Sequence, residues 1–327
     1  MPIQNYPTVF DCTEMTAAVN KLPARPFFFK PLFEVKGVKT TTVSLDIRQG
    51  RIVLIGDSER NTAPESLAGR GAKREWKHLS CAHLAQSDTL APEDLQDVRA
   101  FGSTEPISVA AVYNDKMQQL KDNLAATMEF HRLGAIKGVV LDADGTTVLH
   151  DIFNTFGATK KTLDISFPKT AADDANPILT SILKAKRHVE AAMGGTPFDH
   201  IECIIGSDAY DMLTSHKLVR EYFERWLSNR ENFGNNDYRK RGFPYGGLTF
   251  VERSDVVGGQ TMVAAKKGHV YPVGPGIFKQ YHAPADWMET VNTIGLEYYA
   301  RMDEKPKGRG FDLEVQSNPL TLCTYPE

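Results

Sequence analysis

The sequence predicts an α+β protein, and three observations predict that class. One helical pattern is much longer than the helices of an average globular domain. Alternating β patterns precede it and return at the end of the chain, in residues 289–327. A section that mixes helices and strands, residues 176–288, lies between the long helix and that C-terminal β segment.

The composition is ordinary for a globular protein and argues against several classes. The 327 residues are 41% hydrophobic and 24% charged, and the net charge of −3 argues against a dedicated nucleic-acid binder. No apolar run approaches the roughly 18 residues that a membrane span requires, and the N-terminus lacks a secretory pattern. The four cysteines form no CxxC pair and are expected to be reduced thiols.

Residues 1–38 are predicted to form an extended arm, because five prolines at this density oppose a regular helix. Three consecutive aromatic residues, Phe27, Phe28 and Phe29, lie within it. Two interpretations remain open. The aromatic residues belong to a buried strand, or the arm buries them against a neighbouring subunit.

Residues 39–95 are predicted to contain a strand, because Val43, Leu45 and Ile47 alternate with polar residues. A polar loop follows in residues 56–79, and loops of that length are uncommon within compact domains. With strands on both sides, this segment is expected to form an extended two-stranded flap.

A basic cluster with one aromatic residue lies in this loop. Its members are Arg70, Lys73, Arg74, Trp76 and Lys77. Such a run is typical of a solvated face, and contact with an acidic patch on a neighbouring subunit is the second interpretation. Nucleic-acid contact is the third. Glu75 dilutes the positive charge and weighs against it.

The strongest local pattern predicts one helix over residues 106–133. Pro106 occupies a first helical position behind candidate capping residues, and Gly134 is predicted to end the helix. Apolar residues from Tyr113 to Met128 repeat on one face only. At about 1.5 Å per residue the helix is about 42 Å long, and it is expected to lie along a sheet or a partner.

Residues 139–150 are predicted to form a β-hairpin, because Asp144-Gly145 separates two β runs. The same stretch resembles the first motif of haloacid-dehalogenase-like phosphatases. In that alternative, Asp142 attacks phosphorus and Asp144 acts as acid and base beside Mg²⁺. The hairpin is favoured, because the residues after the turn continue as β instead of opening a helix. The acidic pair Asp173-Asp174 also follows too soon for the phosphatase metal motif.

The section from residue 176 is predicted to be α/β. Asn176 and Pro177 begin a helix that ends at Gly194-Gly195, and Ser215 begins another. A polar loop, residues 229–247, contains the basic triplet Arg239, Lys240 and Arg241. Solvent, a neighbour's acidic patch and a pore are the three candidate environments for this triplet. Strands are predicted at residues 163–167, 201–205, 248–252, 262–265 and 289–327, the last interrupted by a charged turn at 303–309.

No catalytic residue, cofactor site or metal site is expected. His78, Cys81 and His83 have spacing that suits zinc, but no second cluster supplies a fourth ligand. Ser207 lacks the surrounding pattern of a nucleophile turn and is expected to cap a helix.

The order of these elements resembles the major capsid proteins of tailed phages, specifically the lambda E type. The resemblance covers nearly the whole chain. Three stretches carry it: Lys137-Gly138 through Asp144-Gly145 to Leu163-Asp164-Ile165, then Ile204 to Arg225, and finally Val315-Gln316-Ser317-Asn318-Pro319-Leu320.

This resemblance implies a Hong-Kong-97-like capsid fold. Residues 1–38 are then the N-arm, residues 39–95 the extended loop and residues 176–288 the axial domain. Residues 96–175 and 289–327 together are the peripheral domain, with the long helix as its spine. Extended arms suit a shell subunit, which gains stability from repeated contacts with its neighbours.

The resemblance implies a structural, non-enzymatic capsid protein of a tailed phage or prophage. Its hexamers and pentamers form an icosahedral shell in the virion, assembled in the host cytoplasm. The expected partners are further copies of the chain, a scaffolding protein, a portal, a decoration protein and packaged double-stranded DNA held without sequence specificity. The phosphatase and a binding module of unknown partner remain as alternatives.

Overall fold

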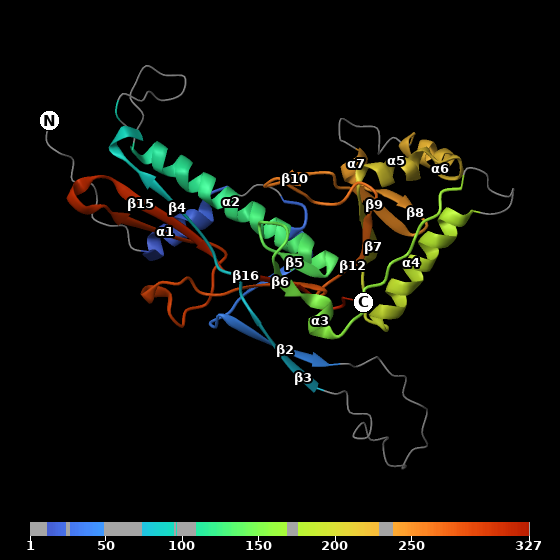
Figure 1. Ribbon diagram of the computed structural model, residues 1–327, viewed down its shortest axis with the longest axis horizontal. Coiled ribbons are helices and arrows are strands. Elements are labelled where there is room, and N and C mark those ends of the chain that lie inside the picture. The colour runs from blue at the N-terminus through green and yellow to red at the C-terminus, as the bar shows by residue number, and fades with distance from the viewer. Residues whose placement is uncertain are drawn as a thin grey trace, which may run out of the picture. The chain divides into compact units, whose positions relative to one another are not determined.

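The computed structural model describes residues 12–23, 27–48, 74–94, 96, 109–168, 176–228 and 238–326. The chain divides into two compact units. Unit 1 comprises Met1–Val43, His78–Arg132 and Lys279–Thr321, and unit 2 comprises Ser44–Lys77, Leu133–Phe278 and Leu322–Glu327. Both units combine helices with sheets, so the predicted α+β class is confirmed (Figure 1).

Unit 1 is built from elements at both ends of the chain. Its elements, some of which extend past the division, are α1 (Cys12–Lys21), β1 (Phe33–Gly37), β4 (Leu84–Leu90), α2 (Val109–Lys137), β13 (Phe278–His282), β14 (Tyr299–Glu304), β15 (Phe311–Ser317), β16 (Pro319–Cys323) and single 3₁₀ turns at Lys30–Leu32, Pro92–Asp94, Met288–Thr290 and Pro306–Gly308. Strands β2 (Thr42–Arg48) and β3 (Arg74–Ser80) pair with each other and cross the division between the units.

Helix α1 corrects the prediction of an extended N-terminal arm. The helix fits into the stretch between Pro7 and Pro23, where no proline opposes it. Met15 and Val19 are four residues apart, so they share one helical face, and both are buried. The strand suggested for Phe27–Phe29 is also absent, because these residues lead into a 3₁₀ turn and β1 begins only at Phe33.

Helix α2 is described over 29 residues, and it confirms the long helix. Its predicted end is wrong, because the helix continues past Gly134 to Lys137. Gly134 instead allows a close approach, since a Cβ there would lie 2.9 Å from the carbonyl oxygen of Val139. The true stop is Gly138, whose φ of +85° suits glycine.

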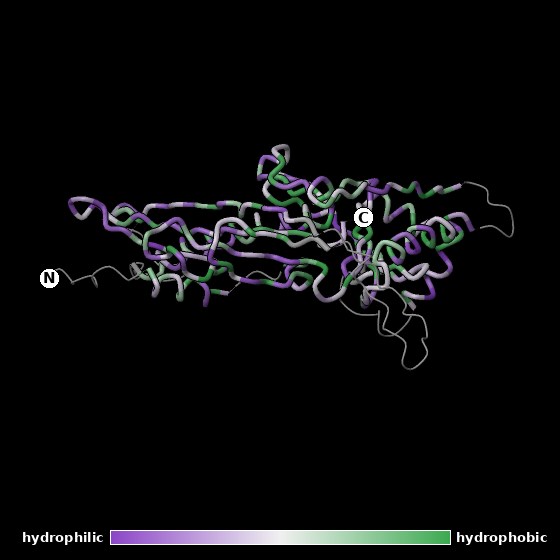
Figure 2. The backbone as a smooth tube through the Cα atoms, turned by 90° about the horizontal axis from the view of Figure 1, so that it is seen from below, coloured by the Kyte–Doolittle hydropathy of each residue, from purple (hydrophilic) through white to green (hydrophobic). Residues whose placement is uncertain are grey.

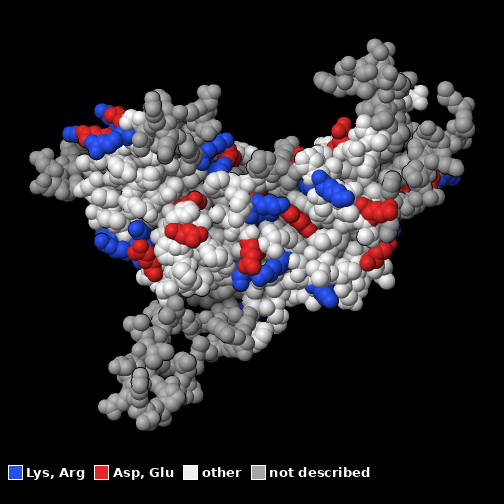
Figure 3. Space-filling view, turned by 180° about the vertical axis from the view of Figure 1, so that it is seen from behind, with Lys and Arg blue, Asp and Glu red and all other residues white. Residues whose placement is uncertain are grey.

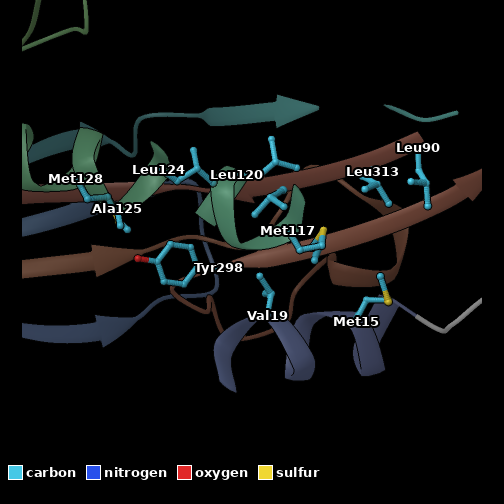
Figure 4. Close-up of a cluster of buried hydrophobic side chains, with 12 residues drawn as sticks. Met15, Val19, Leu90, Met117, Leu120, Leu124, Ala125, Met128, Tyr298 and Leu313 are labelled. Atoms are coloured by element: carbon cyan, nitrogen blue, oxygen red, sulfur yellow. The ribbon is translucent and has the colours of Figure 1, made fainter. Parts of the chain in front are cut away.

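The core of unit 1 lies between α1, α2 and the β14–β15–β4 sheet. In Figure 4, side chains of α1 and α2 point toward each other, with Leu313 and Leu90 from the strands beside them. The cluster comprises Met15, Val19, Leu90, Met117, Leu120, Leu124, Ala125, Met128, Tyr298, Ala300, Leu313 and Val315. The single apolar face predicted for the long helix is therefore the face that packs.

The C-terminal strands are confirmed. Strand β15 pairs antiparallel with β14 on one side and with β4 on the other, matching Leu313 with Met302 and with Asp88. A second sheet has the order β1-β13-β16, which places β1 at an edge. The predicted charged turn connects β14 to β15. Residues 289–298 are not a strand, contrary to the prediction.

Unit 2 contains the hairpin and the α/β section. Strands β5 (Val139–Leu141) and β6 (Val148–Asp151) pair antiparallel, which confirms the hairpin. A four-stranded sheet has the order β12-β7-β9-β8, with β7 and β9 parallel. The remaining elements are α3 (Ile152–Phe156), α4 (Pro177–Met193), β7 (His200–Ile205), α5 (Ser207–Ser215), α6 (Lys217–Leu227), α7 (Tyr238–Arg241), β8 (Phe243–Tyr245), β9 (Leu248–Glu252), β10 (Val256–Val257), β11 (Gln260–Thr261) and β12 (Gly268–Val273).

The predicted ends of α4 in unit 2 are confirmed, and capping residues stand at both of them. Asn176 caps α4 by accepting a hydrogen bond from the Leu179 amide, and Gly194 ends the helix in a left-handed conformation. The predicted helix start at Ser215 is wrong, because Ser215 ends α5 and α6 begins at Lys217, behind its N-cap His216. The strands predicted at residues 163–167 and 262–265 are absent, since neither segment pairs with another.

Among the described residues, none of the helices combines the length and the hydrophobicity that a membrane span requires. Hydrophilic and hydrophobic residues are interleaved along the described helices and strands, as Figure 2 shows.

Candidate assembly surfaces

The N-terminal aromatic residues lie partly inside the chain's own fold. Phe29 is 1% exposed, and its amide donates a hydrogen bond of 2.7 Å to the Glu129 carboxylate on α2. Phe28 meets the Phe29 ring edge-on at 5.1 Å, and Phe27 packs against the core cluster. Of the three, Phe27 and Phe28 remain half-buried and so retain surface for contact with another molecule.

A buried ionic network holds this segment to α2. Arg132 is 1% exposed, and its guanidinium donates 2.8 Å to Gln280 and lies 3.1 Å from the Glu129 carboxylate. Lys30 forms an ion pair of 2.7 Å with Glu297. Because buried charges are costly without partners, this network makes the position of the Phe29 segment specific.

The β2–β3 strand pair carries the exposed aromatic residue of the basic cluster. Trp76 is 57% exposed on β3, and Lys77 beside it is half-buried. Arg70, Lys73 and the Arg74 side chain lie outside the described part of the chain. An exposed tryptophan on a paired strand is a large apolar anchor, and tryptophan is enriched among the residues that dominate binding energy.

The zinc spacing near this strand has another explanation. The His83 ring lies 2.8 Å from the Asn318 side chain in unit 1. No group of three or more histidine, cysteine or acidic residues in the described part could hold a metal ion.

The second basic cluster lies beside carboxylates. Arg239 is 3.7 Å from Glu252, which is 6% exposed. Arg239 and Lys240 line a small cavity of about 150 Å³ together with Glu252, Ser254 and Asp255. The side chain of Arg241 lies outside the described part. The mixed charges make this a locally neutralised surface and not a uniformly cationic patch.

The hairpin turn uses the two carboxylates that suggested a phosphatase. One Asp144 oxygen accepts hydrogen bonds of 2.8 Å from the amides of Thr146 and Thr147, and the other accepts 2.6 Å from the Thr147 hydroxyl. These bonds, led by that of the Thr147 hydroxyl, hold the pKa of Asp144 far below its usual range. Asp142 accepts a hydrogen bond from the Ala143 amide. An Asp144 that stays ionised cannot serve as a general acid.

A larger cavity of about 550 Å³ in unit 2 also lacks phosphatase chemistry. Its lining combines apolar side chains with lysines, Asp164, His188 and His269, and neither Asp142 nor Asp144 belongs to it. Burial raises the pKa of its two thiols, Cys203 and Cys323, to about 12, so both are protonated and poor nucleophiles at neutral pH.

One exposed apolar segment has no counterpart among the predicted site residues. Residues 288–296 connect β13 to β14 and present four exposed apolar side chains. These are Met288 at 87%, Val291 at 57%, Ile294 at 60% and Leu296 at 46% exposure. Their spacing of three, three and two residues matches neither a helix nor a strand, so periodicity alone could not place them on one face.

Charged residues of both signs are interspersed on the face shown in Figure 3. This mixture agrees with the modest net charge of the chain. On this face, therefore, no single sign of charge dominates the electrostatic field.

Comparison with known proteins identifies the family. A family model described as phage major capsid protein E matches residues 11–327. The chain belongs to this family. The match covers every residue that the structure describes, so the surfaces described above belong to a subunit of a phage capsid shell.

Two curated relatives match over nearly their full length. The major capsid protein of Pseudomonas phage KPP10 is 26% identical over 100% of this chain and 97% of the relative. That of Salmonella phage Felix O1 is 24% identical over 97% of this chain and 94% of the relative. Among solved structures, the capsid of Ralstonia phage GP4 covers 92% of this chain and 88% of its own, at 11% identity and a TM-score of 0.49.

Family membership confirms the main functional predictions. The protein is a major capsid protein, a component of the virion that assembles with further copies of itself into the shell. The family is structural and not enzymatic, and the phosphatase alternative has no support. The Hong-Kong-97-like class implied by the sequence resemblance agrees with this membership and with the mixed helices and sheets.

Proposed function

We propose that the chain forms hexamers and pentamers of an icosahedral shell that encloses the double-stranded DNA of a tailed phage. The family match over residues 11–327 carries this proposal. Extended elements with exposed anchors support it, because neighbours in a closed ring touch through different surfaces on their two sides.

The proposed roles of the segments follow the sequence expectation. Residues 1–38 are the N-arm, residues 39–95 the extended loop, and residues 176–288 the axial domain. Residues 96–175 and 289–327 are the peripheral domain, with α2 as its spine. The compact units divide the chain at other points, and we assign the roles by chain order.

The proposed contacts between subunits use residues from three regions. They are Phe27, Phe28 and Phe29 of the arm, Arg70, Lys73, Arg74, Trp76 and Lys77 of the loop, and Arg239, Lys240 and Arg241 near the axial end. Within this set we expect Trp76 to contribute most, because it is 57% exposed, whereas Phe29 is 1% exposed.

Electron microscopy tests the assembly. The chain would be expressed alone and with its neighbouring genes, then examined by negative staining. We expect closed shells, tubes or five-fold and six-fold rings. A uniform monomer or dimer under every condition would reject the proposal. Deleting residues 1–30 would remove Met15, Val19 and the buried Phe29 from the core of unit 1, so the shortened chain is expected to lose stability as well as assembly.

The further partners are a scaffolding protein, a portal, a decoration protein and the packaged DNA, and assembly occurs in the host cytoplasm. With a net charge of −3, contact with DNA is expected to be weak, free of sequence preference and strongly reduced by salt. Co-purification with the products of neighbouring genes tests the protein partners. Binding to two unrelated duplexes at low and high salt tests the DNA contact.

A further inference from the structure

The cavity of about 550 Å³ in unit 2 is lined by segments that lie far apart in the sequence. The end of α2, the segment after α3, helix α4 and strand β12 all contribute to its lining (Figure 1). All of its lining residues belong to unit 2. Small-molecule sites in proteins usually have volumes of about 300–1,000 Å³, so this cavity can hold a ligand of that size.

Positive charge predominates in the lining. Asp164 is the only acidic residue among the described residues of the lining, whereas five lysines belong to it. The lysines are Lys137, Lys160, Lys161, Lys266 and Lys267. None of them forms a salt bridge with a carboxylate in the part of the chain that the structure describes. Their charges are therefore available to an anion.

Three of these lysines converge on one histidine. Lys137 ends α2, Lys160 follows α3 and Lys267 precedes β12, and their positive charges act together on His269 of β12. Burial, followed by these charges, lowers the pKa of His269 to about 4, so the ring is neutral at pH 7. The Lys137 ammonium donates a hydrogen bond to the carbonyl of Met262, which leaves two of its three N–H donors for a ligand. Like charges repel one another, so a bound anion would stabilise this arrangement.

A buried polar atom without a partner belongs to the same lining. His188 lies on α4, and its Nε2 atom is buried with no hydrogen-bond partner among the described residues. Leaving such an atom unsatisfied costs free energy, and an imidazole N–H can donate to an anion. A ligand that accepts this hydrogen bond would remove the cost.

The lining favours a phosphate group joined to an organic group. With five lysines against one aspartate, the site calls for a multivalent anion. A phosphate ester carries a charge of about −1.5 to −2 at neutral pH, more than a single carboxylate, and lysine binds phosphate as a point charge. Aromatic residues, including Phe153, Phe167 and Tyr271, form part of the remaining lining and suit an organic group.

We propose that this cavity binds a small organic phosphate. Its phosphate groups contact the lysines around His269, and its organic part packs against the aromatic lining. This inference goes beyond the proposed assembly and does not depend on it. Because the ligand binds the folded subunit, its binding stabilises that subunit in proportion to the ligand concentration.

Isothermal titration calorimetry of the full-length protein tests the proposal, with ADP as the probe. Pyrophosphate and adenosine are the matched controls, since each carries one half of the required chemistry. We expect ADP to bind more tightly than either control, and its binding to weaken at high salt because salt screens the lysines. Absence of ADP binding, or equal affinity for ADP and either control, would overturn the proposal. A single-stranded DNA oligomer that binds where ADP does not would also overturn it, because the lysines would then contact nucleic acid.

A matched set of substitutions locates the site. Lys160→Gln and Lys267→Gln each remove one charge from the lining, and both side chains are exposed, so the fold should persist. Each should weaken ADP binding by about tenfold, as expected from losing one charged hydrogen bond. Lys217→Gln is the control, because Lys217 is an exposed lysine of unit 2 outside the lining, and it should leave the affinity unchanged. Equal affinities of the three variants would overturn the proposal.

Chemical modification gives a measurement on the unaltered chain. Lysines are acetylated with acetic anhydride in the presence and absence of ADP, and the modified peptides are quantified by mass spectrometry. We expect ADP to protect Lys160 and Lys267 and to leave Lys217 as reactive as before. Protection that is equal at all three lysines, or absent from all three, would overturn the proposed site.

Discussion

Unit 1 contains two groups of apolar side chains with opposite exposure. The core cluster around α2 is buried, with Met128 and Leu313 at 0% exposure, whereas Met288 and Ile294 in the 288–296 segment are 87% and 60% exposed. Both groups consist of similar residue types. The difference teaches that similar apolar residues take opposite environments within one unit. The first group stabilises the fold, and we propose that the second contributes to assembly.

The largest effect on subunit stability is expected in the core. Leu313→Ala should lower the free energy of unfolding of the unassembled subunit by about 4 kcal/mol, because it removes packed methyl groups and leaves a cavity. Leu296→Ala is the matched control, since Leu296 is 46% exposed and the same truncation should cost less than about 1 kcal/mol. Denaturant titration of both variants measures the two losses in the free energy of unfolding. Equal losses would contradict the predicted difference between the buried core and the exposed segment.

The buried ionic network is expected to give the next largest effect. Glu129→Ala removes the acceptor of the Phe29 amide and the partner of Arg132. The buried guanidinium would then keep only Gln280 and the more distant Glu297 carboxylate, 3.8 Å away, and this loss should lower the free energy of unfolding by about 3 kcal/mol. Glu289→Ala at the exposed surface should change it by less than about 0.5 kcal/mol. Thermal unfolding of the two variants, followed by circular dichroism, checks both values.

A smaller, pH-dependent effect is expected at the hairpin turn. The pKa of Asp144 lies below its ordinary value of 3.8, so its contribution to stability is present above that pH and is lost as the pH falls through the lower, folded-state pKa. Asp144→Asn should therefore destabilise the subunit at pH 7, and the difference from the unaltered chain should shrink in acid.

Asp142→Asn is the control for this turn, because Asp142 accepts one hydrogen bond from the Ala143 amide. It should leave assembly unchanged. Unfolding midpoints of the Asp144→Asn variant and the unaltered chain, compared at pH 7 and in acid below pH 2, check the prediction for Asp144, because the contribution is lost only near the folded-state pKa. A difference between the two chains that stays the same in acid would contradict the assignment.

The smallest effect on stability is expected on the exposed surface. Val291→Asp should change the free energy of unfolding by less than about 0.5 kcal/mol, because the side chain is 57% exposed. The same change at Val315, which is 0% exposed, should prevent stable folding, since it buries an unpaired charge. A Val291→Asp subunit that folds but fails to assemble would give the clearest contrast between the exposed segment and the buried core, because it would separate assembly from folding.

The success of prediction differed from one segment to another for physical reasons. The long helix, the hairpin turn and α4 were predictable, because periodicity, Asp-Gly and capping residues act within a few residues. The strands expected at residues 163–167 and 262–265 were not formed. A β pattern needs a partner strand, and the sequence of one segment does not contain that partner.

The candidate assembly surfaces were predictable only in part. Trp76 was predicted to lie in a loop between strands, but it lies on β3, where it is 57% exposed. Phe29 belonged to the same predicted set, but it is buried against α2. The sequence could not show this burial, because Glu129 and Arg132, which hold the segment, lie far away in the sequence. The 288–296 segment was missed, since its apolar residues follow no period.

The sequence by itself determined the α+β class, the long apolar face of α2, the hairpin at Asp144-Gly145 and the resemblance to phage capsid proteins. These depend on local geometry and on the order of elements, which the chain carries directly. Only the tertiary structure decided which apolar residues are buried. Burial depends on contacts between segments hundreds of residues apart, such as α1 with β14, and no local pattern encodes their meeting.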